Sequence, residues 1–330
     1  MASGVNLAWN ACNNAQKHAV RWNRPWLSAF DLHHHVTGGA CKLMGLGAET
    51  LQAVGEQYAQ SRQQQRKRAL RYRGKKTLGW VPFKARGIRQ AGDGFRFMGH
   101  VFRVWLSRPL GGPIRCGSFS QDAQGHWYIN LCCEVPLQPS APTGAIGVDL
   151  GITTAATMSD GTKYDGGRPY RQIEPKLAIA QRARKKGRVK ALHAKAKNRR
   201  RDALHKLSTK LTRENTLVAV GNVSSQAMVK TRMAKGALDA GWSMFKTMLS
   251  YKAIARSVRF AVVDERYSSQ VCSACGSLPA SRPQGIAELG IRAWDCSDCG
   301  ASHDRDVNAA RNILSLALGG QRPAEGIPSL

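Results

Sequence analysis

Four cysteines near the carboxyl end constrain the fold of this chain more than any other feature. They form two Cys-x2-Cys pairs, Cys272 with Cys275 and Cys296 with Cys299, separated by 20 residues. Four thiolates supply the closed tetrahedral shell that structural zinc prefers, with no coordination position left for a substrate. The segment between the pairs is rich in Pro and Gly and too short for a core of its own. The spacing therefore predicts one structural zinc ion that replaces such a core.

The remaining cysteines predict no disulfide framework. The chain has nine cysteines and no recognisable export signal, which favours a reducing compartment, the cytoplasm. We expect the other five to be small core residues: Cys12, Cys41, Cys116, Cys132 and Cys133.

The charge of the chain indicates a polyanionic partner. Fifty Lys and Arg residues stand against 21 Asp and Glu, for a net charge of +29 and an isoelectric point near 10.4. Such an excess opposes compaction by self-repulsion, so it points to binding rather than to folding. No apolar stretch reaches the roughly 18 residues of a membrane span. Nucleic acid, and no membrane, is therefore the expected partner.

Two basic segments are the expected nucleic-acid surfaces. Residues 62–76 carry eight Lys or Arg and no acid, with Tyr72, Trp80 and Phe83 nearby as possible stacking platforms for bases. Residues 182–206 carry twelve Lys or Arg and one Asp, and their Ala and Leu content predicts a long basic helix. The candidate contacts are Arg66, Lys67, Arg68, Arg71, Arg73, Lys75, Lys76, Arg184, Lys185, Lys186, Arg188, Lys190, Arg199, Arg200 and Arg201.

Composition and periodicity predict a multidomain α+β protein. Residues 1–76 have a helical pattern, residues 77–137 read as short strands of a small β-barrel or sandwich, and residues 138–144 form a linker that contains prolines. From residue 145 onward, apolar strands alternate with helices, as in a layered α/β domain.

Carboxylates from separate elements are candidates for a second metal site. Asp149 interrupts an otherwise apolar strand, where an ionised group needs a cation or hydrogen bonds. Asp304 and Asp306 open the last predicted helix, where Asp is also a routine N-cap. If such acids converge, they bind Mg²⁺, and two ions about 4 Å apart hydrolyse phosphodiesters.

The motifs resemble those of the TnpB family of insertion-sequence proteins. The carriers of this resemblance are "GVDLGI", "ERYSSQVCSACG", the paired cysteines and "HDRDVNAARNIL", in this order, within residues 145–318. TnpB proteins are RNA-guided DNA nucleases related to the compact type V CRISPR effectors. The resemblance implies a helical recognition lobe, a β-barrel wedge domain and a RuvC-like domain of the ribonuclease H fold (145–268 and 304–330). A zinc-binding, target-nucleic-acid-binding insert would interrupt that domain at 269–303.

Two catalytic carboxylates carry over directly from the family. Asp149 matches the first and Asp306 the third, whereas Gly221 stands near the place of the second. The strand ending in "VVDE" should lie beside the one with Gly221, where a glycine leaves room for a neighbouring side chain. We therefore expect Glu265 to replace the missing acid, with Asp264 as the alternative.

The resemblance also implies the partners and cofactors. These are a guide RNA, double-stranded target DNA with its displaced single strand, one structural Zn²⁺ and two catalytic Mg²⁺. We expect a monomer on RNA, with a dimer as the alternative, associated with a prokaryotic nucleoid. Two other hypotheses stay open: a nuclease-dead RNA-guided DNA-binding protein and a transposition accessory factor.

Overall fold

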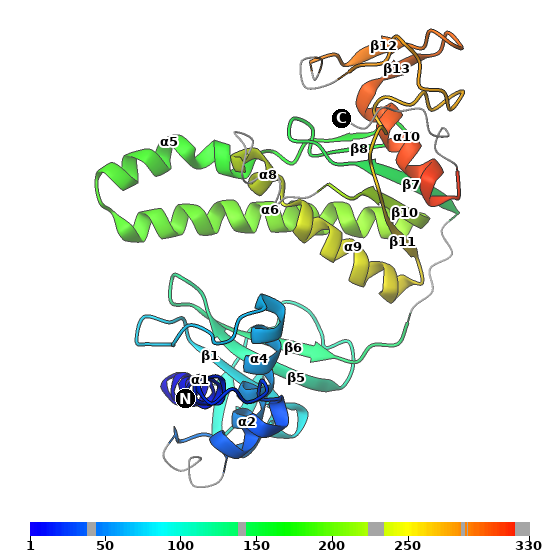
Figure 1. Ribbon diagram of the computed structural model, residues 1–330. Coiled ribbons are helices and arrows are strands. Elements are labelled where there is room, and N and C mark those ends of the chain that lie inside the picture. Colours follow the sequence, from blue (N-terminus) through cyan, green and yellow to red (C-terminus); the bar gives the residue numbers. More distant parts are fainter. Residues whose placement is uncertain (38–43, 138–142, 224–233, 285–287, 289, 321–330) are drawn as a thin grey trace. The chain divides into compact units, whose positions relative to one another are not determined.

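The computed structural model describes residues 1–37, 44–137, 143–223, 234–284, 288 and 290–320 (Figure 1). The chain divides into two compact units, Met1–Val135 and Pro136–Leu330. Both contain helices and sheets, so the predicted α+β class is confirmed. Residues 138–142 of the predicted linker and 321–330 of the last predicted segment lie outside the described residues. None of the described helices is long and apolar enough to cross a bilayer.

The first unit combines helices with two small antiparallel sheets. Its helices are α1 (Ala2–Arg21), α2 (Ala29–Val36) and α4 (Ala48–Gln65), with a 3-10 turn at Ala85–Gly87. One sheet contains β1 (Trp80–Lys84), β5 (Ile114–Gln121) and β6 (Trp127–Cys133), and the other contains β2 (Ile88–Ala91), β3 (Gly94–Phe97) and β4 (His100–Arg103). Among the described residues, no strand pairing joins these two sheets. Closure into a barrel therefore stays a prediction.

Helices and strands of the first unit share one hydrophobic core. Tyr58 of α4, Phe83 of β1 and Phe97 of β3 are almost completely buried in it. The Phe83 ring centroid lies 5.7 Å from that of Phe97 and 5.5 Å from that of Phe119. Phe83 is buried in this core among other aromatic rings, so the prediction that it serves as a stacking platform for bases is wrong.

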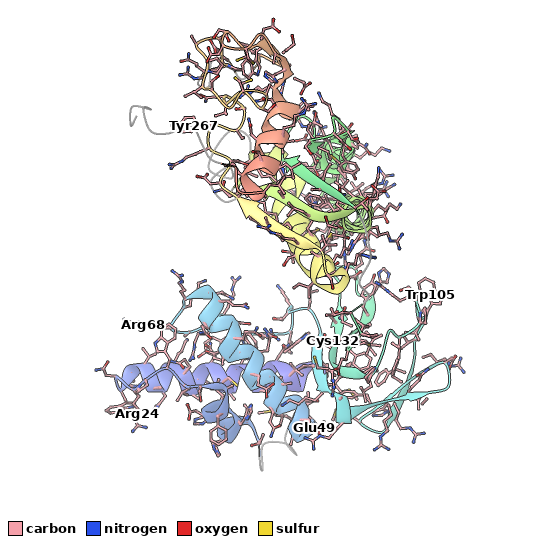
Figure 2. All side chains as sticks on the ribbon, turned by 90° about the vertical axis from the view of Figure 1, so that its right-hand side faces the viewer. Arg24, Glu49, Arg68, Trp105, Cys132 and Tyr267 are labelled. Carbon is pink, nitrogen blue, oxygen red and sulfur yellow. The ribbon has the colours of Figure 1, made fainter. Side chains whose placement is uncertain are left out.

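The isolated cysteines divide between core and surface. Cys12 is buried in α1, as predicted. Cys116 and Cys132 are exposed and lie opposite each other on β5 and β6, so the prediction is wrong for this pair. Figure 2 labels Cys132. Cys133 is half-buried, and Cys41 lies outside the described residues.

The first basic segment is held in an extended conformation along α1. Helix α4 ends just before Arg66, which adopts a left-handed conformation with a φ of 50°. Farther on, the Asn13 amide donates to the Leu70 carbonyl at 2.8 Å and accepts the Leu70 N–H at 3.0 Å. Asn10 binds both backbone groups of Arg73 in the same way, at 2.8 Å each. Two asparagines three positions apart on one helix face therefore fix the backbone of this segment.

The second unit is built on a five-stranded mixed sheet with the order β11-β10-β7-β8-β9. The strands are β7 (Gly144–Asp149), β8 (Ala156–Met158), β9 (Lys163–Tyr164), β10 (Asn215–Gly221) and β11 (Arg259–Val263). Strands β7, β8 and β9 pair antiparallel, whereas β10 pairs in parallel with both β7 and β11. The carboxyl ends of β7, β10 and β11 therefore meet at one edge of the sheet.

Helices cover both faces of this sheet (Figure 1). The helices of this unit are α5 (Pro169–Arg182), α6 (Lys186–Glu214), α8 (Ala234–Ala240), α9 (Trp242–Arg256) and α10 (Arg305–Ala317). Of these, α6, α9 and α10 lie against the sheet, and α5 packs on α6. Along β10, Val218 and Val220 pack in the cluster with α6 and α9, whereas Leu217 and Ala219 pack with Ile313 of α10. This alternation is the period of a strand buried on both faces. A short hairpin, β12 (Ala293–Asp295) and β13 (Ser302–Asp304), precedes α10.

The second basic segment is not one continuous helix. Helix α5 ends at Arg182, Arg184 has a φ of 52°, and α6 begins at Lys186. The left-handed residue reverses the chain, so α5 and α6 pack side by side through Leu177 and Leu192. The prediction of a single helix over 182–206 is therefore wrong at its start.

A side chain at position 147 should separate α10 from the sheet. A Cβ atom on Gly147 would lie 2.1 Å from the Ala310 carbonyl oxygen and 2.9 Å from Leu314. We expect Gly147→Val to lower the free energy of unfolding by about 3 kcal/mol, because overpacking displaces the backbone. Urea unfolding measures the change. In the control Gly187→Ala, on α6, the new Cβ meets nothing within 4 Å and should stabilise the fold by about 0.5 kcal/mol; equal unfolding midpoints for the two variants would contradict this account.

Candidate functional site

The three acids predicted to bind magnesium come to one edge of the sheet from separate elements. Asp149 is the last residue of β7, and Glu265 follows the end of β11 by two residues. Asp306 lies in the first turn of α10, which packs against β7. Because the carboxyl ends of β7 and β11 share this edge, residues far apart in the sequence become neighbours.

The Glu265 side chain occupies the space beside Gly221. Strands β10 and β11 pair with Gly221 opposite Val263, two residues before Glu265. A Cβ atom on Gly221 would lie 2.0 Å from Glu265 Oε2 and 3.1 Å from Glu265 Cβ. Only a glycine leaves this space open. Glu265 Oε2 is buried and has no hydrogen-bond partner among the described residues, and a buried carboxylate oxygen needs a donor or a cation.

The charges of the other two acids act on Asp149. Burial, followed by the negative charges of Asp306 and Glu265, raises the pKa of Asp149 from 3.8 to about 7. Burial also raises the pKa of Glu265, against the opposing effects of the Val223 backbone N–H and the Lys246 ammonium. Like charges disfavour the ionised form of Asp149, so a bound cation would stabilise it.

A cation of the protein already pairs with one of these acids. Arg292 Nη1 donates to both carboxylate oxygens of Asp306, at 3.0 and 3.1 Å. The three carboxylates do not lie within 4.8 Å of one another; among the described residues, the cysteine cluster is the group that meets this limit. A divalent ion shared by the acids would therefore compete with Arg292 for Asp306.

Two neighbouring acids have other roles. Asp304 caps α10, because its Oδ1 accepts the N–H groups of Asp306 at 3.1 Å and Val307 at 3.0 Å. Its Oδ2 pairs with Lys163 at 2.6 Å. Asp264, the alternative to Glu265, accepts the side-chain amide of Asn222 at 3.3 Å. Asp264 thus holds the turn after β11.

The donor set fits magnesium. Carboxylate oxygens are the ligands that this hard cation prefers, and a bound ion would satisfy the orphaned oxygen of Glu265. The same ion would stabilise the ionised form of Asp149, which burial disfavours. The role of Asp149, Glu265 and Asp306 as ligands remains a prediction.

The four cysteines form a cluster that is compatible with zinc. Their Sγ atoms all lie within 4.8 Å of one another, with 3.6 Å between Cys272 and Cys299 and 3.9 Å between Cys275 and Cys296. Tetrahedral zinc with Zn–S bonds of about 2.3 Å requires sulfur separations of about 3.8 Å. Each Cys-x2-Cys pair also closes the same turn, in which a following glycine N–H donates to the first cysteine carbonyl at 2.8 Å.

The sequence prediction missed the residues that support this cluster. The His303 ring packs against Trp294 with centroids 4.7 Å apart, and its Nε2 lies 3.0 Å from Cys272 Sγ. Asn308 and Asn312 of α10 both donate to the carbonyls of Ser268 and Val271. The i, i+4 spacing of two asparagines in "VNAARN" was the available signal. These bonds anchor the entry to the zinc insert on the helix that carries Asp306.

Most of the candidate nucleic-acid contacts are exposed. Thirteen of the fifteen have exposed side chains, including Arg68 just beyond α4 (Figure 2). Arg73 instead stacks on Trp9, with its guanidinium carbon 3.7 Å from the ring centroid. Arg200 pairs with the buried Asp239 at 3.3 Å. Arg73 and Arg200 therefore have structural partners, whereas the others are available to phosphates.

Two family models match the second half of the chain. Residues 130–232 match OrfB_IS605, described as "Probable transposase", and residues 242–313 match the TNB domain of Cas12f1-like proteins. A protein of Streptomyces pristinaespiralis is 39% identical over 238 residues, and InsQ of Escherichia coli K12 is 29% identical over 241 residues. Both carry the name "Putative RNA-guided DNA endonuclease". The resemblance to the TnpB family is therefore confirmed.

The chain covers only part of these relatives. The two alignments span 67% and 63% of this chain and 58% of each relative. A solved structure, described as a complex of Cas12f1 with sgRNA and target DNA, aligns over 95% of this chain and 93% of that chain at 13% identity. Its TM-score of 0.39 is too low to carry an argument.

Neutralising Asp149 should stabilise the magnesium-free protein in a pH-dependent way. The pKa of Asp149 is about 7 in the fold and 3.8 ordinarily, so the folded state holds this proton more tightly than the unfolded state. Stability therefore falls as pH rises from about 4 to 7 and stays low above that. We expect Asp149→Asn to stabilise by about 2–4 kcal/mol at pH 8 and by much less at pH 4. Urea unfolding in magnesium-free buffer without a chelator tests this, and an equal gain at both pH values would contradict it.

Zinc content should depend on the buried cysteines of the cluster. We expect about one zinc per chain in the wild type and a loss of most of it in Cys296→Ser, because a three-thiolate site is incomplete. Elemental analysis measures the metal. Cys132→Ser, an exposed cysteine of the other unit, is the matched control and should keep the zinc; the same zinc content in both variants would refute the assignment.

Proposed function

We propose that this chain is an RNA-guided DNA endonuclease that hydrolyses phosphodiesters with magnesium held by Asp149, Glu265 and Asp306. The observation that supports this most directly is the Glu265 carboxylate. It lies over Gly221 with a buried, unpartnered oxygen, within range of the Asp149 charge. A relocated acid that fills the place of the missing one argues for a retained active site.

The residues around the acids position them for this chemistry. When bound, magnesium activates water and stabilises the leaving oxygen. Pairing with Thr157 of β8 fixes the backbone of Asp149. The Glu265 carboxylate accepts the Val223 N–H, and Lys246 Nζ donates to the Val223 carbonyl at 2.9 Å. Lys246 and Glu265 thus both bind the backbone of Val223.

The proposed partners are a guide RNA, its matching double-stranded DNA and the displaced single strand. The net charge of +29 and the exposed arginines and lysines beside α4 and along α6 support phosphate binding. Base pairing with the guide would read the sequence, so the protein needs to recognise shape and charge. We propose that the chain acts in a prokaryotic cytoplasm, on the nucleoid, as a monomer on RNA.

The proposed domains follow the family. Residues 1–76 would form the recognition lobe and residues 77–137 the wedge domain, which share one core in this structure. Residues 145–268 and 304–330 would form the RuvC-like domain, around a zinc-binding insert at 269–303. The topology of the sheet, with acids at the carboxyl ends of β7 and β11, supports this assignment.

A second candidate function is an RNA-guided DNA-binding protein that does not cut. Gly221 favours it, because the resemblance places a catalytic acid in this strand. The ion pair between Arg292 and Asp306 also suits a site without metal. Such a protein would repress by occupying its target.

Cleavage of a guide-matched DNA duplex in Mg²⁺ separates the two candidates. We expect the wild type to cut and Glu265→Ala and Asp306→Ala to cut at least about 100-fold more slowly, since each removes a metal ligand. Asp264→Asn, the neighbouring acid, is the control and should keep most of the activity. If Glu265→Ala cuts as fast as the wild type, the relocation is wrong. If nothing cuts while guide-dependent binding persists, the second candidate is correct.

Moving the carboxylate back to β10 tests the relocation itself. Gly221→Glu alone should abolish cleavage and lower stability, because its Cβ collides with the Glu265 carboxylate. Adding Glu265→Gly removes the collision and presents a carboxylate from the other strand. We expect this double variant to recover stability in urea unfolding and part of the cleavage rate. A double variant no better than Gly221→Glu would show that the two positions do not share one space.

A further inference from the structure

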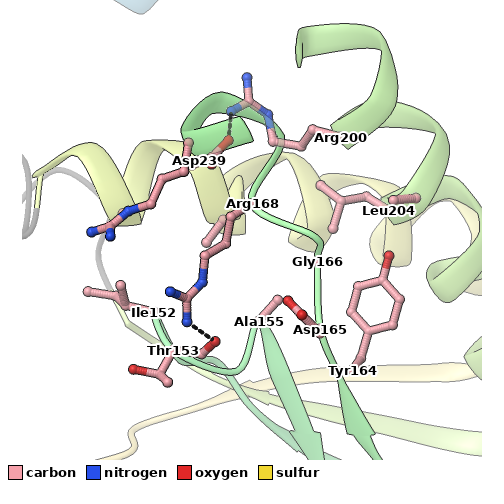
Figure 3. A pocket seen from close by; sticks show the side chains of 14 residues that line it. Ile152, Thr153, Ala155, Tyr164, Asp165, Gly166, Arg168, Arg200, Leu204 and Asp239 are labelled. Carbon is pink, nitrogen blue, oxygen red and sulfur yellow. Dashed lines mark hydrogen bonds and ion pairs between the residues drawn. The ribbon is translucent and has the colours of Figure 1, made fainter. Parts of the chain in front are cut away.

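A pocket in the second unit adjoins the candidate active site along the chain. The turn after β7, the loop before α5, and residues of α6 and α8 form its wall (Figure 3). Ile152 in this wall follows Asp149 by three residues, which limits the separation of their Cα atoms to about 11 Å. A nucleic-acid strand whose phosphate is bound at Asp149 would therefore pass close to the pocket.

One side of the pocket is apolar. Ile152, Ala155 and Leu204 line it, and the Tyr164 ring stands at its edge (Figure 3). Apolar walls with an aromatic ring are the surfaces on which nucleic-acid bases pack.

The other side of the pocket is basic. Arg168, Arg171 and Arg200 contribute guanidinium groups to it. Arg168 crosses the pocket and donates from Nη2 to the Thr153 carbonyl at 2.7 Å (Figure 3). Arg200 Nε is buried and has no partner among the described residues. Guanidinium groups are the side chains best matched to phosphate oxygens.

The acids of the pocket do not cancel this charge. Asp239 is buried and already compensated, since it accepts the Tyr170 N–H at 3.0 Å and pairs with Arg200 at 3.3 Å. Asp165 accepts the Gly167 N–H at 3.0 Å and is exposed to solvent. Three arginines against two acids leave a positive pocket, which attracts an anion.

We propose that this pocket receives one unpaired nucleotide of the strand bound at the active site. The base packs against the apolar side, and the phosphate contacts the exposed Arg168 and Arg171. A base inside a duplex cannot enter a pocket, so the nucleotide is unpaired. This inference rests on the proposed function, and it adds to that function a substrate subsite beside the scissile phosphate.

An abasic scan tests the subsite with the full chain. Single nucleotides are replaced by abasic residues along the DNA strands and, in a separate set, along the guide RNA. Cleavage in Mg²⁺ and binding are measured for each. We expect one position at which the loss of the base slows cleavage about tenfold, as for one stacked base. We expect this position in a DNA strand, because DNA is what the active site cuts; a sensitive position in the guide RNA alone would overturn the subsite.

Two variants connect that position to the pocket. Ala203→Leu extends a side chain into the pocket, and Arg171→Gln removes an exposed guanidinium from its rim. Both should reduce the abasic penalty at that position to less than about threefold. Lys176→Gln removes the same charge from the same helix outside the pocket, and it should keep the tenfold penalty. Arg171 is exposed, so we expect Arg171→Gln to fold. The abasic penalty can then be measured in this variant even if Ala203→Leu unfolds.

The outcomes separate this inference from the proposed function. If the wild type cuts but no position in either DNA strand is sensitive to base loss, the proposed subsite is wrong, whereas the proposed nuclease activity is supported. An unchanged penalty in Arg171→Gln would also overturn the subsite. If the wild type does not cut, the scan of binding affinity still decides, because removing a base held in the pocket weakens binding; equal affinity at every position would overturn the subsite.

Discussion

The parallel pairing of β10 with β11 is the constraint on which the candidate active site depends. It sets Gly221 opposite Val263, so that the chain leaving β11 turns Glu265 back over β10. The absence of a side chain at one position and the presence of a carboxylate at another are therefore one feature of the structure. Neither Gly221 nor Glu265 alone indicates a metal site, since a glycine in a strand and an acid after a strand are both common.

Three half-buried acids near one another require local compensation. Net charge does not supply it, because distant charges are screened within about 10 Å. The compensation comes from Lys246 beside Glu265 and from Arg292 on Asp306. These cations lie on α9 and within the zinc insert, so separate parts of the second unit stabilise the acids.

The predictions from sequence succeeded where one local rule decided the structure. The thiolate spacing predicted the cluster at Cys272, and strand pairing predicted the placement of Glu265 beside Gly221. They failed where a distant partner decided. The backbone after Arg66 leaves the helix because Asn13 of α1 binds it, a contact 57 residues away along the chain. Propensity cannot report such a contact.

The zinc insert and the active site are parts of one structural unit. Arg292 immediately precedes β12, and its carbonyl accepts the Arg305 N–H at 2.8 Å at the start of α10. The guanidinium that binds Asp306 is thus positioned by the hairpin whose turn carries Cys296 and Cys299. Asn308 fastens the other end of the insert to the same helix. Because both ends of the insert attach to α10, whatever orders the cysteines also orders the surroundings of Asp306.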